Sequence, residues 1–84
     1  MSRYFFHLHD LHGPVLDEEG TDLADEAAAL GHAAWCLRDF ASNCILSGQS
    51  VDLGSYIAVC RADGHELRRL YMRDVIRFLP DARD

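Results

Sequence analysis

One alanine-rich segment between strand-like residues restricts what this chain can fold into more than any other feature. It begins between Asp22 and Asp25, either of which can cap a helix, and it ends near Ser47, before Gly48. At 100° per residue its apolar side chains gather into one stripe. The stripe consists of Ala27, Leu30, Ala34, Leu37, Ala41, Cys44 and Ile45, with Ala33 and Phe40 beside it. A single long helix with such a stripe needs a sheet to pack against.

The residues before this helix predict two strands. Residues 3–9 are rich in aromatic side chains, which favour strands. Alternation places Tyr4, Phe6 and Leu8 on one face of the first strand, and we expect that face to meet the core. Residues 15–17 predict a short return strand at a sheet edge, because the proline before them has no N–H to donate.

The residues after the helix predict a hairpin and a second, shorter helix. Residues 55–61 and 66–72 are strand-like and are joined by a turn with an Asp-Gly pair, which is typical of hairpins. Residues 73–79 predict the short helix. The order strand, strand, helix, strand, strand predicts an α+β fold, a two-layer sandwich with one long helix on a small antiparallel sheet. We expect one domain over residues 1–84, with a single modest core.

The net charge of the chain and its cysteines limit which partners and which cellular compartment we expect. The net charge is −6, and residues 1–42 carry all of that excess. An acidic chain is repelled by phosphate backbones, so we expect no general binding to nucleic acid. The three cysteines, Cys36, Cys44 and Cys60, form no closely spaced pair, and no signal segment or membrane-length apolar stretch is present. We therefore expect a cytoplasmic protein with free thiols, no cofactor and no membrane contact.

The outer side of the long helix carries an unexpected apolar strip. Ala28, Trp35 and Leu46 fall within about 20° of one another, nearly opposite the core stripe, with Ser42 beside them. Exposed apolar strips mark interfaces, and tryptophan is enriched at binding hot spots. These four residues predict an interface, and self-association as a homodimer is the leading hypothesis. The alternatives are a different protein partner, or a tryptophan that lies flat or is covered by the C-terminal segment.

A histidine cluster near the N-terminus predicts a second, metal-binding hypothesis. His7 and His9 project from one face of a strand, and Asp10 or His12 can approach from the following turn. Imidazole and carboxylate groups are common metal ligands. No second ligand cluster accompanies this one, so an ordinary polar strand face is the simpler interpretation.

Arginines concentrate near the C-terminus and predict an anion or partner patch. They are Arg68, Arg69, Arg73 and Arg77, of which the last two share a helix face if the segment is helical. A small antitoxin-like regulator that binds nucleic acid through them is a third hypothesis. The acidity of the chain favours contact with an acidic protein surface instead. Nucleophile elbow, phosphate loop and dinucleotide motifs are all missing from the sequence, so we expect no enzyme.

Two motifs resemble a known family. The opening R-Y-F-F at residues 3–6 and the D-E-E-G-x-x-L segment at residues 17–23 resemble a family of short bacterial proteins classed as a domain of unknown function. The resemblance extends to about residue 72 through the alanine-rich helix and the closing hairpin. It implies no activity, cofactor or catalytic residue. It does imply that Asp17, Glu19 and Gly20 set the geometry of the turn that enters the helix.

Overall fold

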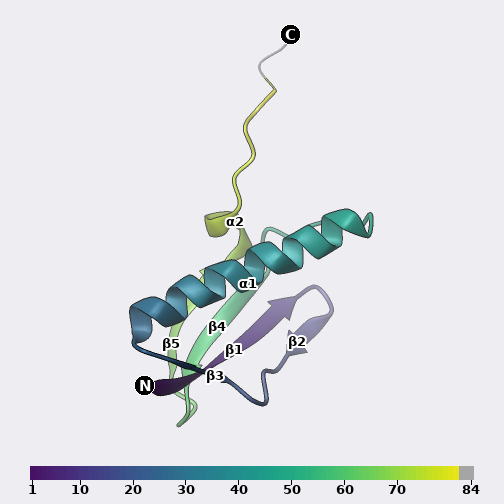
Figure 1. Cartoon of the computed structure of the whole chain (residues 1–84). Helices are drawn as coiled ribbons and strands as arrows, with labels where there is room; N and C mark the ends of the chain where they lie inside the picture. Colours follow the sequence, from purple (N-terminus) through teal and green to yellow (C-terminus); the bar gives the residue numbers. More distant parts are fainter. Residues whose placement is uncertain (82–84) are drawn as a thin grey trace.

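One long helix lies across an antiparallel sheet in the computed structural model of the chain, which describes residues 1–81 (Figure 1). The elements are β1 (Ser2–Asp10), β2 (Gly13–Val15), β3 (Thr21–Leu23), α1 (Glu26–Leu46), β4 (Tyr56–Arg61), β5 (Glu66–Tyr71) and α2 (Met72–Val75). This arrangement confirms the predicted α+β class, with the long helix, the hairpin after it and a short second helix.

Strand β1 organises the sheet because it pairs with three other strands. Its partner along one edge is β4, while β2 and β3 pair with opposite ends of the other edge. The strand order is β2-β1-β4-β5. The edge strand β2 begins at Gly13, two residues earlier than predicted, because the turn before it is tighter. Strand β3 was not predicted, since three residues are too few to show alternation.

Helix α1 has the predicted limits and both predicted kinds of cap. Asp25 is the N-cap, and its carboxylate accepts from the N–H of Ala28 at 2.8 Å. At the other end the N–H of Gly48 bonds the carbonyl of Ile45, and that of Gln49 bonds Cys44. This pair of bonds is the Schellman arrangement, and Gly48 has the positive φ of +75° that it requires.

The buried side of α1 is rotated from the predicted stripe. Its buried residues are Ala29, Ala33, Leu37, Ala41 and Cys44. Ala27 is exposed, and Ile45 is 61% exposed, so both were wrongly assigned to the core. Small alanines lie at the contact because the facing strand β1 supplies large rings, Tyr4 and Phe6. The helix is apolar on much of its circumference, and this is why periodicity alone misplaced the stripe.

The core lies between α1 and the helix-facing side of β1 and β4. Tyr4 and Phe6 are buried as predicted, and Leu8 packs partly against them. Their partners across the β1–β4 pairing include Val59 and Ile57, which are also buried. Among residues 1–81, no helix lies on the opposite side of the sheet (Figure 1), and we call that side the open face.

The C-terminal helix is shorter than predicted. Helix α2 ends at Val75 rather than near Leu79, and Ile76 is already extended, with φ −119° and ψ 133°. Backbone bonds from Met72 to Ser55 and from Arg73 to Leu53 fix α2 to the loop before β4. Since a residue before proline is disfavoured in the helical region, Pro80 opposes a helix through Leu79. The segment after α2 runs away from the body (Figure 1).

Candidate functional site

The predicted interface strip lies on the outer side of α1. Trp35 is 61% exposed and Leu46 is 83% exposed, while Ser42 is exposed and Ala28 is half-buried. The Trp35 indole stacks at 6.3 Å on the ring of His32, with an interplanar angle of 20°. No contact with the C-terminal segment covers the indole within the described residues. The indole therefore has the His32 ring as an aromatic neighbour and remains accessible, and we refer to these four residues as the α1 strip.

His32 connects the strip to the sheet, a role that sequence analysis missed. Its ring meets Phe6 edge to face at 4.7 Å, and its Nε2 lies 3.5 Å from the Sγ of Cys36. Burial raises the pKa of the Cys36 thiol, and the negative charges of Asp39 and Asp17 raise it further. The thiol therefore stays protonated near neutral pH and is a poor nucleophile. The i,i+4 spacing of His32 and Cys36 on a helix is the signal that predicts this pair.

The four residues of the metal hypothesis are separated and already engaged. His7 accepts a hydrogen bond at Nδ1 from the N–H of Asp17 at 3.0 Å. His9 stacks on Tyr56 at 4.6 Å, and Asp10 accepts from the N–H of His12 at 2.8 Å. Over residues 1–81, no three His, Cys, Asp or Glu side chains come together in a group that holds a metal ion. The arrangement gives the metal hypothesis no support.

The arginine cluster is divided by the alternation of side chains along β5, and a β-bulge gives Arg69 an acidic partner. Side chains three residues apart on a regular strand point to opposite faces. The register of β4 and β5 shifts, so that Cys60 pairs with Glu66 while Val59 pairs with Arg68. The shift brings Glu66 and Arg69 together on the open face, where they form an ion pair at 2.9 Å. Arg68 is paired with a core-facing residue instead, on the other face of the sheet.

The remaining arginines also separate. The guanidinium of Arg69 lies 4.7 Å from the centre of the Tyr56 ring, and that of Arg73 lies 4.6 Å from Tyr71. Arg77 lies beyond the end of α2, so the condition under which Arg73 and Arg77 would share a helix face is not met. The four arginines do not form one patch. Those on the open face lie against tyrosine rings, which stabilises cations.

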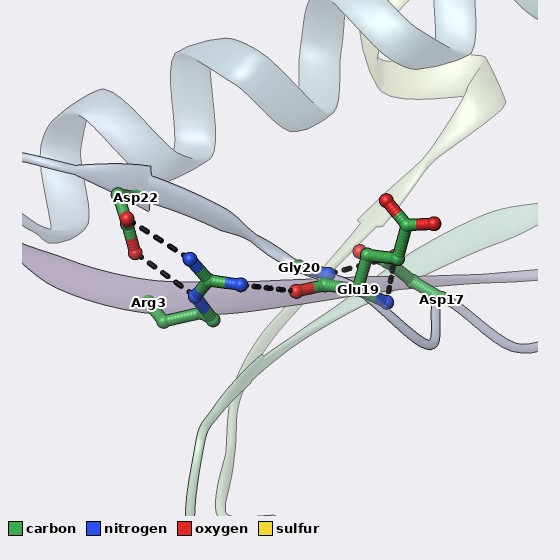
Figure 2. Close-up of polar contacts among 5 residues, drawn as sticks. All are labelled: Arg3, Asp17, Glu19, Gly20 and Asp22. Carbon is green, nitrogen blue, oxygen red and sulfur yellow. Dashed lines mark hydrogen bonds and ion pairs between the residues drawn. The ribbon is translucent and has the colours of Figure 1, made fainter.

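The loop between β2 and β3 is held by the two motifs of the family resemblance. Figure 2 shows Asp17 beside Gly20, whose N–H donates to its Oδ1 at 3.0 Å. The same Oδ1 accepts from Glu19, and Oδ2 accepts from the N–H of Phe6 on β1 at 3.1 Å. Burial alone would raise the pKa of Asp17. The three N–H donors and the nearby His7 outweigh burial and hold that pKa below its usual value.

Arg3 fastens the other side of this loop. Its guanidinium donates two hydrogen bonds of 3.0 Å to Asp22 on β3 and one of 2.8 Å to the carbonyl of Glu19 (Figure 2). The direct bond to Arg3 lowers the pKa of Asp22. Glu19 takes part through its backbone, so the loop geometry expected from Asp17, Glu19 and Gly20 depends on only one of the two acidic side chains.

Gly20 meets a steric requirement at the same place. Its φ is +73°, and a Cβ at this position would lie 2.9 Å from the carbonyl oxygen of Tyr4, as well as from Arg3 and Phe5. Only glycine fits such an approach. These contacts make the loop a structural brace between β1 and the entry to α1.

The comparison with known families agrees with the resemblance. The family described as "Domain of unknown function (DUF6894)" matches residues 3–73. The chain belongs to the DUF6894 family. Neither a curated protein nor a solved structure matches it. The brace and the α1 strip lie within the matched part of the DUF6894 domain, whereas the segment after α2 follows it.

One further finding concerns membranes. In the part of the DUF6894 chain that the structure describes, no helix combines the length and the apolar character needed to cross a bilayer.

Proposed function

We propose that this DUF6894 domain is a non-enzymatic interaction module that forms a homodimer through the α1 strip. The observation that carries the proposal is the exposure of Trp35, 61% of which is accessible on the outer side of the longest element. A large aromatic side chain contributes most of its binding energy when a partner removes it from water. An indole kept in place by His32 loses little conformational freedom on binding.

The surroundings of Trp35 support a helix as the partner surface. Gly31 lies one turn before it, is exposed, and has no atom within 4 Å of the place where a Cβ would be. A glycine inside a helix costs about 1 kcal/mol relative to alanine. No neighbouring group within the chain requires a glycine at position 31, so packing inside the chain gives no reason for this loss of helix stability. A second helix that approaches closely at Gly31 gives such a reason, because it needs the space that a side chain would fill.

The other hypotheses have less support. The Cys36 thiol is disfavoured as a nucleophile by its raised pKa. Arg69 is engaged by Glu66, which leaves fewer free cations for phosphates. The free thiols of Cys36, Cys44 and Cys60 are consistent with a reducing compartment, so we place the homodimer in the cytoplasm.

The proposal is tested by replacing Trp35 with glutamate and measuring dimerisation by sedimentation. The buried charge and the lost indole raise the dimer dissociation constant about thirtyfold or more, as expected for a hot-spot residue of about 2 kcal/mol. Circular dichroism checks that the variant folds, which the exposure of Trp35 predicts.

Leu11→Glu is the matched control. Leu11 is 82% exposed in the β1–β2 turn, where it lines a hollow with Phe40 and the buried Cys44 of α1 and lies off the α1 strip, so its replacement leaves the dimer unchanged. A dimer that resists Trp35→Glu but is lost in Leu11→Glu contradicts the proposal, because the interface then lies on the hairpin.

A further inference from the structure

The segment after α2 is an apolar arm with a fixed origin. Phe78 is 67% exposed and Leu79 is 93% exposed, and the segment extends away from the body (Figure 1). Its origin is held, because the carbonyl of Val75 accepts from Arg38 Nε at 3.3 Å and the N–H of Ile76 bonds Met72 at 3.1 Å. We call residues 76–80 the arm. The first residues of the arm are therefore fixed beside α1, and the arm exposes two adjacent apolar side chains, Phe78 and Leu79.

The arm and the α1 strip are complementary in polarity and in charge. Arg77 directly precedes Phe78 in the arm, and Asp39 follows Trp35 by four residues, one turn along α1. Within residues 1–81, neither the Arg77 side chain nor the Asp39 side chain has a hydrogen bond or an ion pair. Each surface therefore offers an exposed ring with an opposite, unpaired charge beside it.

We propose that the arm of one copy lies across the α1 strip of a second copy, with Phe78 against Trp35 and Arg77 next to Asp39. The inference rests on the proposed homodimer and specifies which surfaces meet in it. Two antiparallel α1 helices that cross near Trp35, one turn from Gly31, place the origin of each arm, which is held at Arg38, beside the partner's strip. The arm then spans the interaxial distance of about 8–10 Å with four residues that reach about 13 Å.

The area that these side chains offer is adequate for a stable dimer. A buried aromatic side chain contributes about 150–250 Å². Because Trp35 is 61% exposed and Phe78 is 67% exposed, these side chains from both copies give on the order of 400–650 Å² of the roughly 1,200–2,000 Å² that stable interfaces bury. Leu46 and Leu79, which are also exposed, supply much of the rest.

A charge-reversal experiment in the full chain tests the pairing. Arg77→Glu and Asp39→Arg each raise the dimer dissociation constant on the order of fivefold, because each places like charges together. The double variant, Arg77→Glu with Asp39→Arg, restores the dissociation constant to within about twofold. Arg68→Glu is the control, since it makes the same charge change on β5 and leaves dimerisation unchanged. Failure of the double variant to restore the dimer overturns the pairing.

A second variant tests the apolar contact separately. Phe78→Ser with Leu79→Ser raises the dissociation constant tenfold or more, while both changes are at exposed positions and spare the fold. If this variant dimerises as tightly as the parent chain while Trp35→Glu does not, the arm inference is wrong and the proposed homodimer stands. If the parent chain is a monomer at every concentration, the proposed function itself fails.

The same variant separates contact in trans from contact within one chain. An arm that folds over its own α1 changes the Trp35 fluorescence of a monomer when Phe78 and Leu79 are replaced. That outcome overturns the inference. Contact in trans predicts a fluorescence change that appears only at concentrations where the parent chain is dimeric.

Discussion

Asp17 and Gly20 hold one loop against β1 by two different physical means. The carboxylate of Asp17 supplies acceptors for three backbone N–H groups that the loop would otherwise leave without a protein partner. Gly20 supplies space, because any side chain there would overlap the backbone of Tyr4. The two residues explain physically why the D-E-E-G segment accompanies the R-Y-F-F opening. Both motifs build a single brace, and neither has a catalytic geometry.

Replacing Gly20 with alanine tests the steric part of the brace. Gly20 and Gly48 have nearly the same φ, +73° and +75°, but only Gly20 has atoms within 4 Å of the Cβ position. Gly48→Ala lowers the unfolding free energy by about 1–2 kcal/mol, because alanine is strained at a positive φ. Gly20→Ala lowers the unfolding free energy by more than this, because the new Cβ also forces the chain to move away from the Tyr4 carbonyl. Denaturant unfolding measures both variants, and equal losses would show that the close approach is not important.

The pH dependence of stability tests the carboxylate of Asp17. Because its pKa is lower in the folded state than the unfolded value of about 3.9, Asp17 contributes stability above about pH 4–5. That contribution is lost as the pH falls through the folded-state pKa. Unfolding free energies between pH 6 and 3 therefore decline less steeply in Asp17→Asn than in the parent chain. An identical decline in both proteins would mean that Asp17 is not stabilised by the brace.

At the scale of the elements, α1 shows which features a single sequence predicts. Its caps and its length followed from local chemistry, since Asp25, Gly48 and the alanines between them act within a few residues. The direction of its core face depends on the rings that it meets on β1, and those are set by the sheet. The assignments of Ala27 and Ile45 to the core were wrong for this reason.

The N-cap of α1 can be tested by two substitutions at one position. Asp25→Ala removes the acceptor for the N–H of Ala28 and lowers the unfolding free energy by about 1 kcal/mol, within a range of about 0.5–2. Asp25→Asn keeps an acceptor oxygen, so it lowers the unfolding free energy much less. The alternative cap, Asp22, bonds Arg3 instead. Thermal unfolding of the two variants gives the comparison, and equal losses would argue against a capping role.

The candidate site was predictable only in part. The exposure of Trp35 followed from its angle on the helical wheel, and the structure agrees. The ion pair of Glu66 with Arg69 did not, because it depends on a bulge between β4 and β5 that has no local signal. His32 was missed since its contact with Phe6 joins residues distant in sequence. Sequence periodicity does not predict long-range contacts of this kind.

At the scale of the whole molecule, the exposed apolar surface is divided between three places. In the described residues they are the β1–β2 hairpin with Leu16 after it, the outer side and end of α1, and the arm, while Met1 and Leu53 are exposed singly. The acidic excess of residues 1–42 includes Asp39 beside Trp35, while the arm carries the positive charge of Arg77. These features support our proposal that a second copy binds the α1 strip, because the two surfaces are complementary in apolar area and in charge. An association of this kind weakens with salt only modestly, because apolar burial dominates it.

The central claim is that this DUF6894 domain forms a homodimer through Trp35, and native mass spectrometry of the untagged chain tests it most directly. The account predicts a dimer of the parent chain, free of metal, at micromolar concentration, and a monomer of the folded Trp35→Glu variant under the same conditions. A parent chain that is monomeric throughout, or a Trp35→Glu variant that remains as dimeric as the parent chain, would contradict the account.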